Sequence, residues 1–373
     1  MPHLLEEIII EILLRSSPKS LSKFRCVSKP WSLLFNNLKL IEMIKNNFSI
    51  MLISGYDMYS IDNESLSSSL PNSIERIHRP LIGIFRGISV VGCCNGLFCI
   101  RNTGHHDFSL WNPSTGDCIR IPSPPGDQFQ VGYYWNGHEG IGYGFGYDSK
   151  TDDYKLVCFI SYFNLNQSEA KIYSLRSGSW EQFKRTQNIP WLLSSRSPRY
   201  GVFHNGALHW QSSSSSKALI AFHVTDGLTR GISPQKNSNF DKFYGTPCID
   251  VLDGCLCMIY CNVKLGFEVW LMKNYGKKES WTKTYSISKL TSLETRSFGG
   301  LRRIECLKTG EILLEVYYNE KNGFYKEALV LYDPKNKTSM DLKPDKGTWS
   351  SNSLSFHRYV KSAVSVSFST KAD

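Results

Sequence analysis

Hydrophobic residues in the N-terminal segment recur at helical spacing. Five aliphatic side chains lie three or four positions apart and therefore share one face of a helix: Leu5, Ile8, Ile9, Ile12 and Leu13. Ser17 followed by Pro18 is typical of an N-cap and a first helical residue, which predicts a second short helix. A few short helices in about forty residues cannot bury this much apolar surface alone. We therefore expect the segment to pack against another protein or against the rest of the chain.

From about residue 88, short apolar runs separated by turn residues replace the helical period. Five turns recur between strand-like runs at nearly regular spacing: Asn95-Gly96, Asp148-Ser149, Asn205-Gly206, Asp253-Gly254 and Thr309-Gly310. A second turn follows each of them, at 112–116, 176–178, 225–227, 274–276 and 333–336. Asn-Gly and Asp-Gly suit the positive φ angles of tight hairpins. The pattern predicts five units of four strands each between residues 88 and 342.

Four-stranded units at a regular period are typical of a β-propeller. A sixth unit can be assembled from both ends of the chain, from a hairpin at 48–61 and strands near Ser355–Tyr359 and Ala363–Phe368. Pairing strands from the two ends in one blade closes the ring and hides exposed sheet edges. We expect a mainly β fold of about six blades closed in this way. A β-sandwich is the competing fold, which the near-regular period disfavours.

Tryptophans recur near the ends of the predicted blades, where we expect them to pack between blades: Trp111, Trp180, Trp210, Trp270 and Trp281. The glycine-rich run 140–146 leads into a strand and lacks the last glycine of the dinucleotide-binding fingerprint, so we interpret it as scaffold. Residues 62–73 are rich in Ser and Asn and are expected to form a surface loop.

Composition narrows the functional classes. The formal net charge is +10, but the basic residues are scattered, so an acidic partner fits better than nucleic acid. The eleven cysteines contain no C-x-x-C pair, and we expect them to be reduced and mostly buried. Reduced thiols place the protein in the cytoplasm or the nucleus. Neither a secretory signal nor an apolar run long enough to span a membrane is expected.

No enzyme motif stands out. The chain has no G-x-S-x-G elbow, no Walker-A loop and no H-E-x-x-H. His204 and His209 flank a predicted hairpin turn, but no third ligand accompanies them, so we interpret them as isolated surface histidines. The adjacent carboxylates Asp152 and Asp153 are expected to point apart and not to form an acid–base couple. We predict neither a metal nor a cofactor, and no catalytic residue.

The N-terminal pattern resembles an F-box, the module that docks a substrate-recruiting protein onto the Skp1 subunit of a cullin-RING ubiquitin ligase. The matching positions are Leu4, Glu7, Ile8, Ile12, Leu13, Arg15, Lys19-Ser20-Leu21, residues 24–29 and Trp31. The resemblance implies an F-box at residues 1–46 that contacts Skp1 through apolar side chains. We expect these to be Leu4, Leu5, Ile8, Ile12, Leu13, Leu21, Phe24, Val27 and Trp31.

The rest of the chain resembles the plant F-box-associated domain, which is often described with kelch-like repeats. The resemblance lies in residues 92–97, 110–116, 144–148, 152–157, 171–175, 208–210, 251–257, 269–273 and 280–283. The chain is similar to plant F-box proteins that restrain immune-receptor levels and to pollen S-locus F-box proteins. It implies that residues 47–373 form a kelch-like propeller. The whole chain would then be a non-catalytic adaptor that binds a target protein and joins cullin-1 through Skp1.

Two departures from the F-box pattern leave a second hypothesis open. Leu5 stands where the family has proline, and Ser16-Ser17-Pro18 stands where it has Leu-Pro-Val. The chain could therefore be a propeller that binds a protein or a glycan outside the ligase. A third hypothesis, a propeller enzyme, requires carboxylates or histidines gathered at the ring axis. Loops on a rigid scaffold usually carry binding, and the candidates are residues 62–80, 126–140, 186–199 and 234–246.

Overall fold

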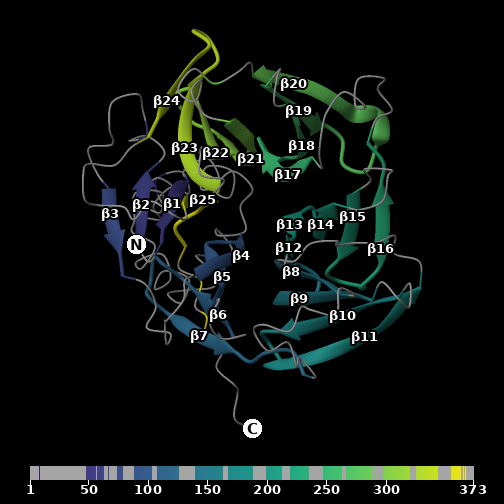
Figure 1. Ribbon diagram of the computed structural model, residues 1–373. Coiled ribbons are helices and arrows are strands. Elements are labelled where there is room, and N and C mark those ends of the chain that lie inside the picture. The colour runs from purple at the N-terminus through teal and green to yellow at the C-terminus, as the bar shows by residue number, and fades with distance from the viewer. Residues whose placement is uncertain are drawn as a thin grey trace.

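The structure is a computed structural model, and its strands form six sheets around a common axis (Figure 1). It describes residues 8, 48–55, 57–62, 66, 74–78, 88–102, 107–125, 139–162, 167–187, 199–211, 219–234, 247–262, 266–287, 290, 297–319, 325–342, 354–362, 364 and 366. The predicted N-terminal helices lie outside these residues, except for Ile8, which is helical. The prediction of a mainly β, six-bladed propeller is confirmed. No helix in the described part is long and apolar enough to cross a membrane.

The first three blades are built as follows. Blade 1 contains β25 (Leu354–Tyr359), β1 (Ser49–Ser54), β2 (Asp57–Asp62) and β3 (Ile74–Ile77). Blade 2 contains β4 (Ile88–Cys94), β5 (Leu97–Asn102), β6 (Phe108–Trp111) and β7 (Cys118–Ile121). Blade 3 contains β8 (Glu139–Asp148), β9 (Asp153–Tyr162), β10 (Gln167–Ser174) and β11 (Ser179–Gln187), and the short β12 (Arg199–Tyr200) pairs in parallel with β8.

The remaining three blades are also given from the innermost strand to the outermost. Blade 4 contains β13 (Val202–His204), β14 (Ala207–Gln211), β15 (Leu219–His223) and β16 (Thr229–Ile232). Blade 5 contains β17 (Cys248–Leu252), β18 (Cys255–Asn262), β19 (Gly266–Met272) and β20 (Trp281–Ile287), with a short 3-10 helix η4 (Lys278–Ser280) before β20. Blade 6 contains β21 (Ser297–Cys306), β22 (Ile312–Asn319), β23 (Tyr325–Asp333) and β24 (Thr338–Asp341).

Strands from the two ends of the chain close the ring, as predicted. β25 pairs antiparallel with β1, so that Tyr359 lies opposite Ser49. The expected strand at 363–368 is wrong, because Val364 and Val366 are not in a strand and the outermost strand of blade 1 is β3. The chain after β25 instead crosses to blade 2, where the amide of Asn112 donates hydrogen bonds to the carbonyls of Ser362 and Val364, at 3.0 and 2.8 Å.

Local turn chemistry explains the hairpins between the first two strands of the blades. Asn95 and Gly96 both have positive φ, at 51° and 81°, and the Asn205-Gly206 and Asp253-Gly254 turns repeat this pair. In blade 3 the turn is wider than predicted. Asp148 is the last residue of β8, and the positive φ, 52°, falls on Asp152.

Apolar residues pack between neighbouring blades, as the aromatic pattern predicted. Trp111 lies in a cluster shared by blades 1 and 2, Trp210 in one shared by blades 3 and 4, and Trp270 and Trp281 in one shared by blades 4 and 5. The glycine-rich run lies in β8, where a Cβ on Gly144 would come within 2.7 Å of the side chain of Leu208 in blade 4. These glycines therefore allow two blades to approach closely.

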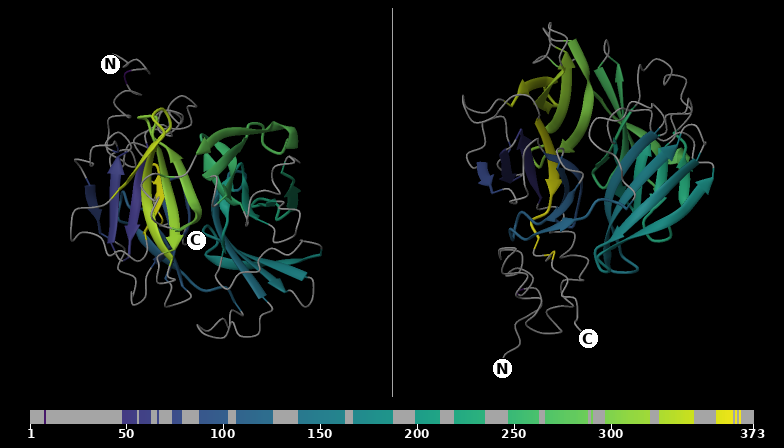
Figure 2. Two further views of the ribbon diagram at one scale, coloured as in Figure 1. Left: turned by 45° about the horizontal axis from the view of Figure 1, so that its top comes forward. Right: turned by 60° about the horizontal axis from the view of Figure 1, so that its bottom comes forward.

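The ring has two faces that differ in their connections (Figure 2). On one, the turn face, the first strand of a blade turns into the second and the third turns into the fourth. The connections between second and third strands and between blades begin and end on the other, the loop face. Phe48 precedes β1 and meets the end of β25, so the chain from the N-terminal segment reaches the propeller on the turn face.

Candidate functional site

The predicted Skp1-binding residues lie outside the described part of the chain, with the exception of Ile8. These are Leu4, Leu5, Ile12, Leu13, Leu21, Phe24, Val27 and Trp31. Ile8 is helical and 44% exposed, a large exposed fraction for an isoleucine. Exposure of this side chain is compatible with a contact to a partner, and the roles of all nine residues stay predictions.

The predicted recognition loops fall on both faces. The segments around 126–140, 186–199 and 234–246 connect successive blades, so their anchoring strand ends lie on the loop face. The fourth, 62–80, is not a single loop, because β3 lies inside it. Leu66 is buried among the side chains between blades 6 and 1, so the expectation of a surface loop at 62–73 is wrong at this position. The candidate binding surface is therefore the loop face.

Titratable groups do gather beside the inner strands of blades 5, 6 and 1, which are β17, β21 and β25. The Oδ2 of Asp250 on β17 accepts the backbone N–H of Ile304 on β21 at 3.2 Å. The Oε2 of Glu315 on β22 accepts the backbone N–H of Phe356 on β25 at 3.1 Å. Because an inner strand has no neighbouring strand on its axial side, these carboxylates satisfy amide groups that would otherwise lack a partner.

Burial and the nearby Arg303 act in opposite directions on the pKa values of Asp250 and Glu315. Burial raises the pKa of Asp250 and raises that of Glu315 to about 7. The guanidinium of Arg303, whose Nε lies 3.8 Å from Glu315 Oε2, opposes both shifts. The axial carboxylates thus serve as acceptors for neighbouring strands. Among the described residues, no three His, Cys, Asp or Glu side chains are placed to hold a metal ion.

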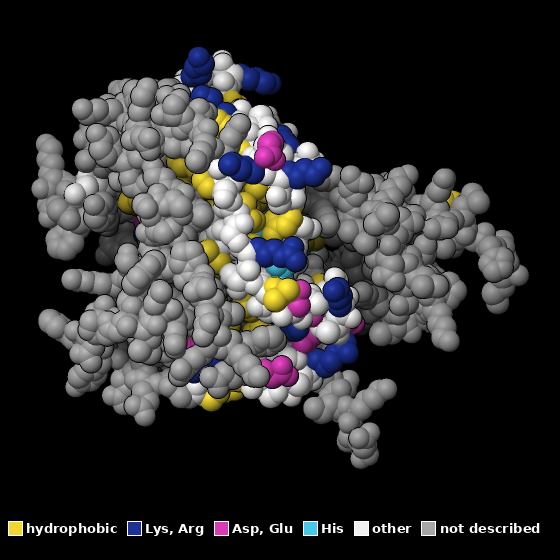
Figure 3. Space-filling model, turned by 90° about the vertical axis from the view of Figure 1, so that its right-hand side faces the viewer, with side chains coloured by type: hydrophobic (Ala, Val, Ile, Leu, Met, Phe, Trp, Pro, Cys, Tyr) yellow, Lys and Arg dark blue, Asp and Glu magenta, His cyan; other side chains and the backbone are white. Residues whose placement is uncertain are grey.

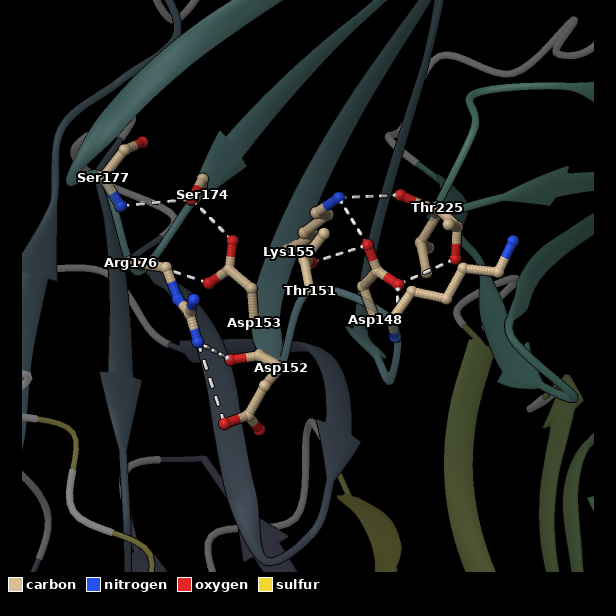
Figure 4. Close-up of polar contacts among 11 residues, drawn as sticks. Asp148, Thr151, Asp152, Asp153, Lys155, Ser174, Arg176, Ser177 and Thr225 are labelled. Atoms are coloured by element: carbon tan, nitrogen blue, oxygen red, sulfur yellow. Dashed lines mark hydrogen bonds and ion pairs between the residues drawn. The ribbon is translucent and has the colours of Figure 1, made fainter.

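A second polar network joins blades 3 and 4 on the turn face (Figure 4). Asp148 is fully buried and accepts hydrogen bonds from Lys155 Nζ at 2.8 Å, Thr151 Oγ1 at 2.7 Å and Thr225 Oγ1 at 2.8 Å. Burial alone would raise the pKa of Asp148, but these hydrogen bonds outweigh it and hold that pKa well below its usual range. The network fixes the first turn of blade 3 against the second turn of blade 4.

The two neighbouring carboxylates of the same turn both contact Arg176 (Figure 4). Asp153 Oδ1 accepts the backbone N–H of Arg176 at 2.9 Å and its Oδ2 accepts the hydroxyl of Ser174 at 2.5 Å. Asp152 Oδ2 lies 3.7 Å from the Arg176 guanidinium. These contacts fix a turn, and the expectation that Asp152 and Asp153 are not an acid–base couple stays a prediction.

The interpretation of His209 as a surface histidine is wrong. Only 1% of its surface is exposed, its Nδ1 lies 3.1 Å from the carbonyl of Val202, and its Nε2 lies 2.8 Å from the hydroxyl of Tyr275. Burial lowers the pKa of His209 to about 4, so the ring is neutral at physiological pH. Tyr275 comes from the next blade, 66 positions along the chain, and no local sequence pattern indicates this pairing.

The exposed surface carries charge of both signs. On the side of the ring drawn in Figure 3, described Lys and Arg side chains lie together with acidic and uncharged ones. This agrees with the scattered basic residues of the sequence.

Comparisons with known proteins identify the two parts of the chain. The family described as the F-box associated beta propeller domain matches residues 48–366, and the F-box domain matches residues 1–42. The chain is 28% identical to F-box protein CPR1 of Arabidopsis thaliana, over 90% of this chain and 83% of that protein. It is 30% identical to the F-box/kelch-repeat protein At3g23880 of the same plant, over 78% of this chain and 81% of that protein. The chain therefore belongs to the F-box proteins that carry an F-box-associated β-propeller domain.

Proposed function

We propose that this protein is the substrate-recognition subunit of a Skp1–cullin–F-box ubiquitin ligase. The F-box at residues 1–46 would bind a Skp1-like protein, and through it cullin-1, while the propeller at 47–373 would bind a target protein. One observation carries the proposal: an F-box match at residues 1–42 stands directly before a closed propeller. The chain joins that propeller at Phe48 on the turn face, which leaves the loop face available for the target.

The chain itself would perform no chemistry in this role. Binding both Skp1 and a target raises the local concentration of target lysines near the charged ubiquitin-conjugating enzyme, which accelerates transfer without a catalytic group on the adaptor. The axial carboxylates support this division of labour, because Asp250 and Glu315 accept hydrogen bonds from neighbouring inner strands.

Target recognition is assigned to the loop face, by the segments around 126–140, 186–199 and 234–246. Each is anchored between strands of two packed blades, and loops on a rigid scaffold usually carry specificity. We also place the protein in the cytoplasm or the nucleus. The ten described cysteines are all free thiols, as expected in a reducing compartment.

Co-purification with a Skp1-like protein tests the proposal. The double variant Ile8→Ala, Trp31→Ala should lose Skp1, because it removes two apolar side chains from the predicted contact. Ile74→Ala is the matched control, since Ile74 is also an exposed isoleucine but lies on β3 of the propeller. Retention of Skp1 by a folded double variant would overturn the proposal. A second variant carries Leu5→Pro and has Leu-Pro-Val in place of Ser16-Ser17-Pro18, which matches the family pattern. If this variant binds Skp1 and the wild-type chain does not, the propeller acts outside the ligase.

A further inference from the structure

The residue that links the propeller to the N-terminal segment is unusually well held. Phe48 precedes β1 and is only 5% exposed. Its ring packs in the apolar cluster between blades 6 and 1, together with Leu307 and Phe356. The chain therefore leaves the propeller from a point fixed by side chains of two blades.

A cation holds the other side of this ring. The guanidinium carbon of Arg358, on the closing strand β25, lies 3.9 Å from the centroid of the Phe48 ring. Nη1 of Arg358 donates to Oε1 of Glu305 on β21, 3.0 Å away, and Glu305 is only 3% exposed. Because a guanidinium binds an aromatic face most strongly when both are partly removed from water, the ring is held between Arg358 and the blade core.

A second tie lies one residue further along. Oδ1 of Asp62 accepts the hydroxyl of Ser49 at 2.7 Å and Lys361 Nζ at 2.8 Å. The segment that follows Phe48 is thus connected to the segment that follows β25. Both ends of the propeller chain are fastened together on the turn face.

We infer that the Phe48–Arg358 contact is an orienting clamp, which sets the direction in which the chain runs from the propeller to the F-box. The inference rests on the proposed function. A mobile joint would let a bound target sample a large volume, and its effective concentration at the transfer site would fall. Arg358 is a positioning residue in this scheme: it acts through Phe48, and its loss should alter orientation while both binding surfaces remain intact.

Single-molecule Förster resonance energy transfer, which measures the distance between two dyes, tests the clamp directly. Dyes are attached through unnatural amino acids at position 23 in the F-box and at position 282 on the exposed strand β20, replacing Lys23 and Thr282. The full chain is measured alone and bound to Skp1. The wild-type chain should give one narrow distance distribution, and Arg358→Ala should widen it at least twofold. Phe48→Leu keeps an apolar side chain and the Glu305–Arg358 pair, and it should widen the distribution in the same way.

Two further variants control for general damage. Phe48→Tyr retains an aromatic face and should keep the narrow distribution. Lys283→Ala removes an ion pair with Glu268, 3.1 Å long, in blade 5 and should also keep it. Skp1 affinity should stay within twofold of wild type in all four variants. Unchanged widths in folded Arg358→Ala and Phe48→Leu would overturn the clamp. Failure of the wild-type chain to bind Skp1 would overturn the proposed function alone, because the widths are also measured without Skp1.

Discussion

Oε2 of Glu315 in blade 6 accepts the backbone N–H of Phe356 on β25, the closing strand of blade 1, 3.1 Å away. Glu327 makes the same kind of contact to the N–H of Leu354, at 2.7 Å. The closing strand is therefore held by blade 1 on one side and by carboxylates of blade 6 on the other. Ring closure depends on side chains as well as on strand pairing.

Replacing Glu315 should loosen this closure. Glu315→Ala leaves the Phe356 amide without its acceptor in a buried place, which costs about 1–3 kcal/mol of the free energy of unfolding. Glu315→Gln keeps an acceptor oxygen and should cost less. Urea denaturation measures both, with Glu279→Ala on exposed η4 as the control. Equal stability of Glu315→Ala and Glu279→Ala would contradict this account of closure.

The packing of the segment after β25 against Gly96 predicts a loss of stability when this glycine is replaced. This glycine has a φ of 81°, and a Cβ on it would come within 2.5 Å of the Val360 carbonyl oxygen. Gly206 occupies the same turn position in blade 4, at a φ of 74°, with nothing within 4 Å of its Cβ position. Gly206→Ala should therefore cost only the backbone strain, about 1–2 kcal/mol.

Gly96→Ala should cost clearly more than Gly206→Ala, because it must also displace the segment that crosses to blade 2. Hydrogen exchange should then increase at the backbone N–H of Ser362, which donates to Ser114 Oγ of blade 2 at 3.3 Å. The two variants share backbone strain, so the difference between their unfolding free energies isolates the clash. A difference near zero would mean that the C-terminal segment does not pack there in solution.

The Asp148 network predicts a loss of stability in acid. The pKa of Asp148 is depressed in the folded protein, so its contribution is present above the pKa of the unfolded chain and is lost as pH falls through and below it. Asp148→Asn should lower stability at pH 7 and remove this part of the acid dependence. Asp148→Ala, which leaves Lys155 without its buried partner, should cost about 3–5 kcal/mol. Denaturation of each variant between pH 2 and pH 7 checks this, and Asp226→Asn in an exposed turn is the control.

Burial of His209 predicts a second loss of stability, at higher pH than the loss that involves Asp148. Burial lowers its pKa to about 4, whereas an unfolded histidine titrates near 6.5. The unfolded chain therefore binds a proton first, and stability falls as pH drops from about 6.5 to about 4, by roughly 3 kcal/mol in all. His209→Gln should flatten the stability curve in this window, whereas His78→Gln, on an exposed histidine after β3, should leave it unchanged. Parallel curves for wild type and His209→Gln would show that His209 is not buried in a neutral form.

Much of this fold follows from local patterns. Asn95-Gly96 marks a hairpin because both residues tolerate positive φ, and the tryptophans mark the packing between blades because large aromatics need buried surroundings. β3 escaped prediction because its sequence, Ile-Glu-Arg-Ile, covers the outer edge of a blade and carries no buried face. Val364 and Val366 alternate with serines like a strand, but Val366 is buried against blades 2 and 3 without strand pairing.

Contacts between residues far apart in the sequence account for most of what was missed. The partner of His209 lies on the next blade, and the clamp on Phe48 comes from the other end of the chain. No local pattern encodes such pairs, since they depend on the closure of the ring. The nine predicted Skp1-binding residues rest on the family motif, and their roles await experiment.

Titration of the purified full-length chain with a Skp1-like protein tests the central claim most directly. Calorimetry should show saturable one-to-one binding by the wild-type chain and none by the Ile8→Ala, Trp31→Ala variant, with the propeller of both melting at the same temperature. A wild-type chain that melts as a folded propeller yet gives no heat of binding would contradict the assignment of this protein to a ubiquitin ligase.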